Sequence, residues 1–211
     1  MALRRLKLLF LFALLGMRTA AQDQTNPSLV TAVKLPSATV ELAPTPVIVP
    51  RDSVMKAAYR DAFEILSRQN RCSDFYGGPA IARVVLNDLV SRAQYGYLPI
   101  TISFEMTGEG TYVTNLPTGA AYRLFEKMTV NYHGAFYKDR NLNVEKTPKV
   151  GSFRPNTRPA RALILLHEMG HLIRRNGAWL IPDDGRYWWR SRENTRLIEQ
   201  TCREELQSLD K

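Results

Sequence analysis

The sequence lacks a hydrophobic run long enough to cross a membrane. Its longest apolar run, residues 8–17, has ten residues, whereas a spanning helix needs about 20. Internal repeats and nucleic-acid-binding motifs are also missing. These absences argue against a membrane-spanning protein, a repeat protein and a nucleic-acid-binding protein.

The N-terminus has the pattern of a secretory signal peptide. Three basic residues within positions 1–7 precede the apolar run, and small residues at positions 19–21 follow it. We expect cleavage after Ala21, export of residues 22–211 to the periplasm or the outside, and no membrane partner after cleavage. The alternative is that residues 1–21 remain as an N-terminal membrane anchor.

The charge is moderate once this leader is set aside. The whole chain has 29 basic and 20 acidic residues, a formal net charge of +9. Four basic residues and no acidic ones lie within residues 1–21, so the remainder carries +5. This balance needs no nucleic-acid partner. Because seven arginines and all three tryptophans lie between positions 174 and 203, binding of anionic polymers by the C-terminal third remains an alternative function.

Cysteine is scarce as well, with only Cys72 and Cys202. An even count in an exported protein favours a disulfide between them. The bridge would enclose 129 residues, and the chain-entropy model gives such a loop about 4–5 kcal/mol of stabilisation. A reduced pair, or Cys202 acting as a metal ligand, is the alternative.

The remaining pattern predicts an α+β fold in a single domain, residues 51–211, preceded by a Pro-rich extended tail or linker, residues 22–50. Apolar spacing predicts four helices, at residues 53–68, 81–94, 157–175 and 192–209. Alternation predicts three strands, at residues 100–104, 111–114 and 128–132. We expect Gly108–Gly110 to be the turn between the first two strands and Asn176-Gly177 to end the third helix.

Histidine occurs only three times, and two of the three histidines lie four residues apart in the third predicted helix. The motif reads His167-Glu168-Met169-Gly170-His171. Residues i and i+4 lie on the same face of a helix, so both imidazoles can reach one metal ion. The alternative is two histidines that are merely packed and hydrogen-bonded in the core.

This spacing points to hydrolysis by a zinc-activated water. A catalytic zinc keeps three protein ligands and one water, and it lowers the pKa of that water to about 7. His167 and His171 would be two ligands. Glu168 would act as the general base toward the water and then pass the proton to the leaving amine.

The motif and its apolar flanks resemble the active-site helix of the zincin metallopeptidases. The segments 72–79, 134–137 and 194–202 also resemble a group of uncharacterised secreted bacterial proteins that carry this motif. The zincin resemblance implies His167 and His171 as zinc ligands and Glu168 as the catalytic carboxylate. It further implies a helix packed beside a sheet whose edge strand holds an extended substrate.

The third zinc ligand is not specified by the resemblance. Arg174 and Gly177 stand where one zincin pattern has a glycine and a third ligand, and Glu193 lacks the surroundings that another pattern requires. From reach and chemistry we place Asp184 first, because it lies in a short loop soon after the motif helix. Three other candidates remain open: Asp183, Glu193 and His133.

Together these features predict a secreted zinc-dependent peptidase that acts on peptide or protein substrates. The alternative is a non-catalytic exported protein whose metal site is structural or vestigial and which acts in binding. Tyr187 is a candidate donor to an oxyanion. The oligomeric state is not predicted.

Overall fold

The computed structural model describes residues 50–99, 101–113, 116, 120–139, 147–185 and 187–211. The chain divides into two units, Met1–Thr39 and Val40–Lys211. The predicted signal peptide and the Pro-rich segment, apart from Pro50, lie outside the described residues. None of the helices within the described residues is long and apolar enough to cross a membrane.

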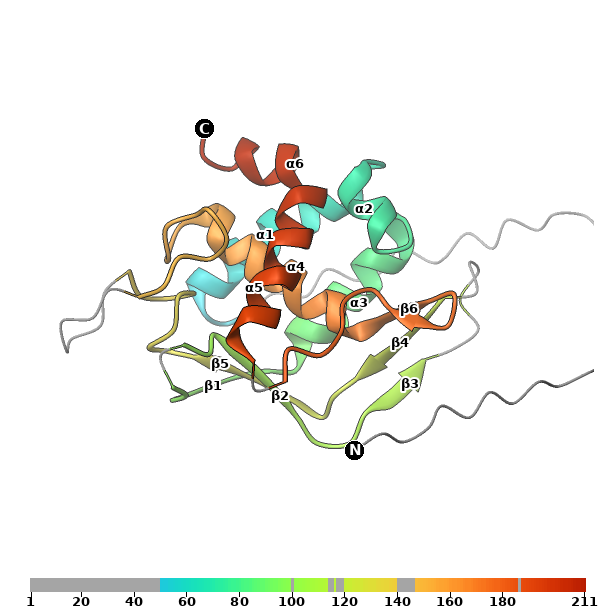
Figure 1. The fold of residues 1–211 in the computed structure, drawn as a ribbon, viewed down its shortest axis with the longest axis horizontal. Helices are drawn as coiled ribbons and strands as arrows, with labels where there is room; N and C mark the ends of the chain where they lie inside the picture. The colour runs from blue at the N-terminus through green and yellow to red at the C-terminus, as the bar shows by residue number, and fades with distance from the viewer. Residues whose placement is uncertain (1–49, 100, 114–115, 117–119, 140–146, 186) are drawn as a thin grey trace, which may run out of the picture. The chain divides into compact units, whose positions relative to one another are not determined.

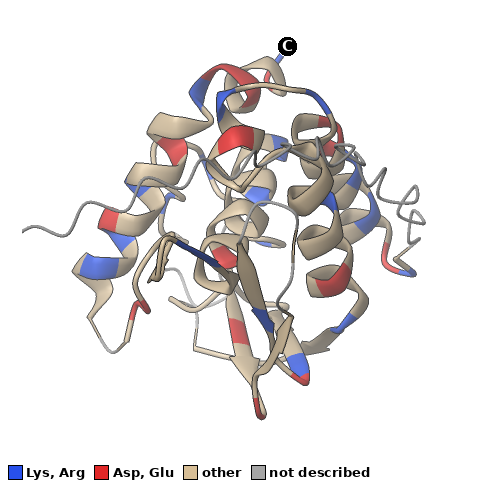
Figure 2. Cartoon of the chain, turned by 90° about the vertical axis from the view of Figure 1, so that its right-hand side faces the viewer, with Lys and Arg blue, Asp and Glu red and all other residues tan. Residues whose placement is uncertain are grey.

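The described part of the chain is α+β, as the sequence predicts (Figure 1). Its helices are α1 (Ser53–Ser67), α2 (Arg71–Phe75), α3 (Pro79–Ser91), α4 (Arg158–Leu172), α5 (Trp188–Thr201) and α6 (Arg203–Ser208). Its strands are β1 (Ala93–Gly96), β2 (Phe104–Thr107), β3 (Thr111–Val113), β4 (Ala121–Leu124), β5 (Lys127–Asn131), β6 (Ile173–Arg175) and β7 (Ala178–Trp179). Acidic and basic positions are interspersed along the helices on the side that Figure 2 presents.

The strands form two small, mostly antiparallel sheets, ordered β1-β5-β2 and β3-β4-β6-β7. Among the strands of the described residues, only β1 and β5 pair in parallel. Phe104 pairs with Val130 in the first sheet, and Val113 pairs with Tyr122 in the second. Residues 104–113 therefore run antiparallel to residues 122–130 through both sheets, and the two sheets share one long, bent hairpin.

The prediction that Gly108–Gly110 turns the chain between two paired strands is wrong. β2 pairs with β5 and β3 pairs with β4, so these residues lie within one course of the hairpin, opposite residues 125–126. Three residues facing two make a bulge, which bends a strand. Gly108 has φ +90°, and a Cβ there would lie 2.7 Å from the Cβ of Glu126. The glycine therefore permits the close approach at this bend.

The strand predicted at residues 100–104 begins only at its last residue, Phe104. The buried side chain of Asn131 takes the place of a neighbouring strand. Its amide donates to the carbonyl oxygens of Leu98, Pro99 and Ile102, at 3.0, 3.0 and 2.7 Å. Because those backbone groups are satisfied by one side chain, the segment forms a loop.

The motif helix α4 ends at Leu172, three residues earlier than predicted, and Asn176-Gly177 does not end it. These two residues have φ of 51° and 81° and form the turn between β6 and β7. Asn-Gly favours this two-residue hairpin turn because both positions need positive φ. Residues 173–175 then pair with β4 on one side and β7 on the other, so sheet hydrogen bonds replace the last helical turn.

Helix α4 is the central element of the core. It packs against α1, α3 and α5, and Figure 1 shows it between those helices. Leu163, Leu165, Leu166, Met169 and Leu172 are each at most 1% exposed. Such an all-round apolar helix is stable only when other elements cover it, which fixes the position of the histidines it carries.

Candidate metal centre

Two histidines and one aspartate bring their ligand atoms together at the C-terminal half of α4. The Nε2 atoms of His167 and His171 are 3.0 Å apart, and both rings are buried. Asp184, in the loop between β7 and α5, places Oδ2 3.1 Å from His167 Nε2 and Oδ1 3.5 Å from His171 Nε2. These three residues form a group that could hold a metal ion.

The spacing of the three ligand atoms suits a tetrahedral metal. For bonds of about 2.0–2.1 Å, two ligands of a tetrahedral zinc lie about 3.3–3.4 Å apart. The three separations of 3.0, 3.1 and 3.5 Å bracket that value. The atoms are therefore placed like three corners of a ligand tetrahedron without any rearrangement of the backbone.

Thr195 determines which nitrogen of His167 carries the proton. The Thr195 hydroxyl donates its only proton to the carbonyl oxygen of Ser191, at 2.8 Å. Its contact of 3.1 Å with His167 Nδ1 must then be a hydrogen bond donated by Nδ1–H to the hydroxyl oxygen. In neutral His167 this leaves a lone pair on Nε2, the atom that faces Asp184.

A bare Nε2 lone pair and a carboxylate oxygen 3.1 Å apart repel each other unless a cation is present. That cation is a second proton on His167, a protonated His171, whose Nε2 lies 3.0 Å from that of His167, or a metal ion. Outer contacts that hold an imidazole in one tautomer are typical of metal-ligating histidines. The contact to Thr195 therefore agrees with the donor set.

Asn194 holds the carboxylate of Asp184. Its buried side-chain amide donates to Asp184 Oδ1 at 2.7 Å and to the carbonyl oxygen of Pro182 at 2.8 Å. Both bonds come from α5, one residue before Thr195. Two consecutive residues of α5 thus orient two different members of the group.

The electrostatics of the group follow from this packing. Burial opposes ionisation of the Asp184 carboxyl, but hydrogen bonds from His167 and His171 outweigh it and lower its pKa below the usual range. Burial opposes protonation of His171, but its hydrogen bond to Asp184 outweighs burial and raises the pKa of His171. Asp184 is therefore an ionised carboxylate, and its charge favours a cation beside it, either a proton on an imidazole or a metal ion.

Glu168 follows His167 directly in α4 and lies beside this group. Its side chain is half-buried, and removal of its carboxyl from water raises its pKa. Within the described residues no hydrogen-bond donor contacts its carboxylate. Its oxygens are therefore available to a water molecule near the histidines.

The other candidate ligands lie elsewhere among the described residues. The carboxylate of Asp183 pairs with the guanidinium of Arg123. Glu193 is exposed on α5, and His133 packs its ring 5.0 Å from that of Tyr97. None of them belongs to the group that could hold a metal.

Arg123 was not singled out from the sequence, yet it joins three parts of the site. Its Nε donates to the carbonyl oxygen of His171 at 3.2 Å, and another nitrogen pairs with Asp183. Its guanidinium lies 4.3 Å from the ring centroid of Trp179. β4 thereby holds the end of α4 beside the loop that carries Asp184. No sequence motif marks this role.

Gly170 allows the chain that follows β7 to approach the motif helix. A Cβ at this position would lie 2.9 Å from two side-chain carbons of Ile181. The Ile181 amide also donates to the Gly170 carbonyl oxygen at 3.4 Å. The glycine thus serves close packing, which brings Asp184 within reach of His167.

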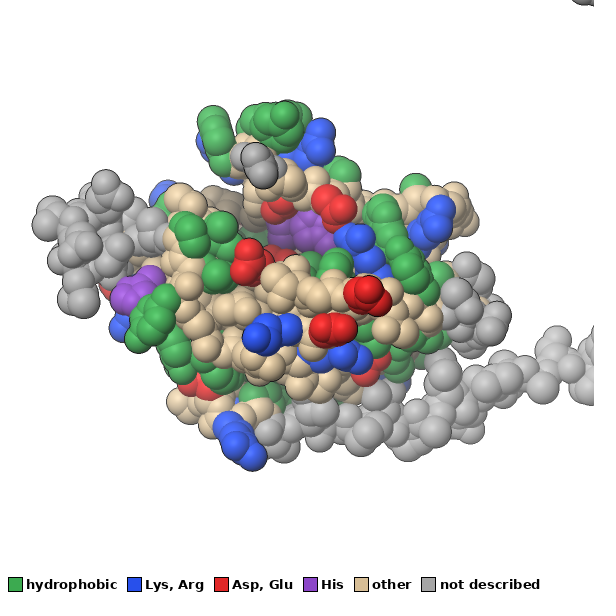
Figure 3. Space-filling view, turned by 90° about the horizontal axis from the view of Figure 1, so that it is seen from below, with side chains coloured by type: hydrophobic (Ala, Val, Ile, Leu, Met, Phe, Trp, Pro, Cys, Tyr) green, Lys and Arg blue, Asp and Glu red, His purple; other side chains and the backbone are tan. Residues whose placement is uncertain are grey.

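The histidines open onto a hollow of the surface. Figure 3 shows a histidine surface recessed between acidic side chains, with a projecting group of hydrophobic side chains on one side of the hollow. Both imidazoles are about 5% exposed, whereas the Asp184 side chain is 27% exposed. The group is therefore recessed but reachable from solvent.

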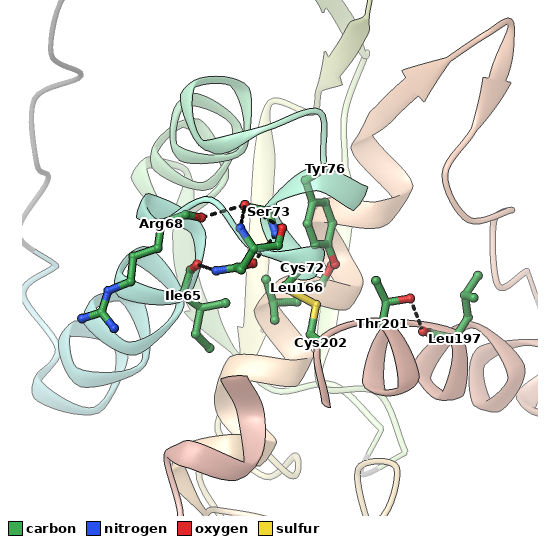
Figure 4. The surroundings of a disulfide bond; sticks show 10 residues. Ile65, Arg68, Cys72, Ser73, Tyr76, Leu166, Leu197, Thr201 and Cys202 are labelled. Carbon is green, nitrogen blue, oxygen red and sulfur yellow. Dashed lines mark hydrogen bonds between the residues drawn. A yellow bond between two sulfur atoms is a disulfide. The ribbon is translucent and has the colours of Figure 1, made fainter. Parts of the chain in front are cut away.

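A disulfide and a tyrosine anchor the helices around the site (Figure 4). Cys72 and Cys202 lie at disulfide distance, as the sequence predicts, and they join α2 to the end of α5. The Tyr76 hydroxyl donates to the carbonyl oxygen of Leu166 at 2.7 Å, and burial raises the pKa of that hydroxyl. The segment that contains Cys72 thus fastens both α4, just before His167, and α5, which carries Thr195.

Comparisons with known proteins do not identify the site. No protein-family model, no curated protein and no solved structure matches this chain.

Proposed function

We propose that this protein is an exported zinc-dependent peptidase. The observation that carries the proposal is the combination of three converging ligand atoms with an adjacent carboxylate that has no hydrogen-bond partner among the described residues. His167, His171 and Asp184 would hold the metal, and Glu168 would act on the water. The disulfide pair supports export, because such bonds persist in oxidising compartments.

Zinc fits the donor set best among common metals. Two imidazoles and one carboxylate are the ligands of many catalytic zinc sites, and three protein ligands leave one position for water. When bound, the metal would lower the pKa of that water and polarise the substrate carbonyl. Two of these ligands, His167 and Asp184, are oriented by Thr195 and Asn194.

Glu168 would move the protons of the reaction. It would accept a proton from the attacking water and donate it to the amine of the leaving peptide. The proposal assigns this role to Glu168 because it follows His167 directly in α4 and no donor within the described residues engages its carboxylate. A carboxylate held in a salt bridge would be a weaker base.

The substrate would be an extended peptide. β2 and β3 lie at the edges of their sheets, so each leaves a row of backbone groups that an extended chain could pair with. The zincin resemblance implies this mode of binding. Tyr187, which is exposed and follows Asp184 by three residues, remains the candidate donor to the oxyanion.

The first test is elemental analysis of the exported protein purified without added metal. We expect about one zinc per chain in wild type, and loss of zinc in His167→Ala and in His171→Ala. Glu168→Gln should keep the zinc but lose hydrolysis of a broad peptide library. Glu193→Gln, an exposed carboxylate on α5, is the matched control and should keep both.

One observation favours the non-catalytic alternative. Both oxygens of Asp184 face the imidazoles, and a carboxylate that binds through both would fill the position a catalytic zinc leaves to water. Wild type that holds zinc but hydrolyses no peptide in the library would establish this alternative. Wild type that is folded, holds no metal and takes up none on addition of zinc would overturn both functions.

A further inference from the structure

The start of α5 displays three consecutive aromatic side chains to solvent. Tyr187, Trp188 and Trp189 are 58%, 70% and 44% exposed. Tyrosine and tryptophan normally bury much of their large rings. A contiguous group of exposed aromatic side chains marks an interaction site more often than it marks ordinary surface.

Arginines cover these rings and give the group a positive charge. The guanidinium of Arg190 lies 5.9 Å from the ring centroid of Tyr187 and 5.3 Å from that of Trp189. The guanidinium of Arg192 lies 5.5 Å from the ring of Trp188. Stacking on an aromatic face holds a guanidinium in place without neutralising its charge. Tyr187, Trp189 and Arg190 contact one another, and Trp188 contacts Arg192. These five residues at the start of α5 are aromatic and cationic and are called here the aromatic–arginine surface.

The shape of this surface bears on the kind of partner it fits. Rings that are 44–70% exposed stand out from α5 instead of lining a pocket, and on the face that Figure 3 presents a hydrophobic group projects next to basic side chains. A projecting group has no facing wall to enclose a bound peptide. It suits a soft, extended partner into which the rings can insert.

We propose that the aromatic–arginine surface docks on anionic lipid bilayers. The two tryptophan rings would enter the boundary between headgroups and acyl chains, where amphipathic aromatic side chains are most stable. The guanidinium groups of Arg190 and Arg192 would meet lipid phosphates. The sequence predicts no membrane partner after cleavage because no segment can span a bilayer, and docking at the surface requires no span.

The docking surface adjoins the hollow that holds the metal group, since Asp184 precedes Tyr187 by only three residues. This consequence rests on the proposed peptidase function: the substrates would be protein segments held at a membrane surface. The docking itself requires neither the metal nor the peptidase activity, so the two proposals fail separately.

The test is sedimentation of the protein with vesicles of phosphatidylcholine alone or with added phosphatidylglycerol. We expect binding to the anionic vesicles only. The double variant W188A/W189A should bind at least about tenfold more weakly, because the buried aromatic area is lost. Arg190→Gln and Arg192→Gln should each weaken binding about fivefold. All variants carry the same N-terminus, so any contribution from the leader is shared.

Tyr97→Ala is the matched control, because Tyr97 is 78% exposed and lies outside the aromatic–arginine surface. It should bind vesicles as wild type does, and zinc content should be unchanged in every variant. Failure of wild type to bind anionic vesicles would overturn the proposal. Equal vesicle binding by W188A/W189A would also overturn it. So would binding to a soluble polyanion that is as strong as binding to vesicles and is unchanged in W188A/W189A, because either result means that charge attraction alone accounts for the binding.

Discussion

Replacing Thr195 with valine tests whether its hydroxyl prepares His167 for a metal. Valine keeps the shape of threonine but removes the acceptor for the Nδ1–H of His167, which lies 3.1 Å away. A buried donor that loses its partner costs about 1–3 kcal/mol. In the metal-bound form His167 must carry its proton on Nδ1, so that form bears the whole penalty. We therefore expect zinc affinity to fall about 10–100-fold.

The metal-free protein should be affected much less. Without zinc, a neutral His167 can carry its proton on Nε2 and donate it to Asp184, 3.1 Å away. The free energy of unfolding of the metal-free Thr195→Val variant should then change by less than about 1 kcal/mol. This difference between the two forms separates preparation of the ligand from general stabilisation.

The assay is competition for zinc against a chromophoric chelator, with urea unfolding of the metal-free protein beside it. Thr195→Ser keeps the hydroxyl and should bind zinc within about threefold of wild type. Thr201→Val is the matched control, because the Thr201 hydroxyl also donates four residues back along α5, at 2.8 Å, but is exposed. Wild-type affinity in Thr195→Val, or an equal loss in Thr201→Val, would refute the reasoning.

Asp184, the disulfide and Gly170 each give a further prediction. Asp184→Asn should lower zinc content by at least about tenfold, whereas Asp183→Asn should leave it near wild type because that carboxylate pairs with an arginine; equal losses in the two variants, measured by elemental analysis, would contradict the assignment. Replacing both Cys72 and Cys202 with serine should lower the free energy of unfolding by about 4–5 kcal/mol in urea titrations, given the separation of 130 positions, and a loss under about 1 kcal/mol would contradict the bridge. Gly170→Ala should destabilise the protein by about 1–3 kcal/mol although alanine favours helices, because the new methyl would lie 2.9 Å from a buried isoleucine; a higher melting temperature would show that this contact relaxes freely.

The longer helices were predictable because their evidence is local, whereas the five-residue α2 was not expected. Asp52 caps α1 by accepting a hydrogen bond from the Met55 amide at 2.7 Å, and the apolar spacing that follows predicts its extent within a residue or two. The last predicted helix, residues 192–209, is two helices, α5 and α6, separated at Cys202. α5 also begins four residues earlier than predicted, so it includes Trp188 and Trp189. Periodicity finds a helix but does not locate a break or an exposed first turn.

The strands were harder to predict because pairing depends on distant residues. β1, β4, β6 and β7 were not expected, and each has at most four residues. Strands this short carry too little alternation to detect. The Asn176-Gly177 pair had the right local chemistry for a reversal, but only its neighbours decide whether it ends a helix or joins two strands.

The sequence by itself determined the paired imidazoles. A helix with histidines at positions 167 and 171 places both rings on one face whatever surrounds it, because that geometry depends only on the helical repeat. It also determined that two cysteines were available for one bridge. Asp184 ranked first among several candidate ligands, on grounds of reach alone.

Only the tertiary structure grouped Asp184 with the two histidines and supplied the contacts that support them. The close packing of Ile181 on Gly170 brings the Asp184 loop against α4, and an arginine engages Asp183 instead. Asn194 and Thr195 contact Asp184 and His167 from a different helix, 10 and 28 positions away. Contacts of that kind depend on how α4 and α5 pack, which no local pattern encodes.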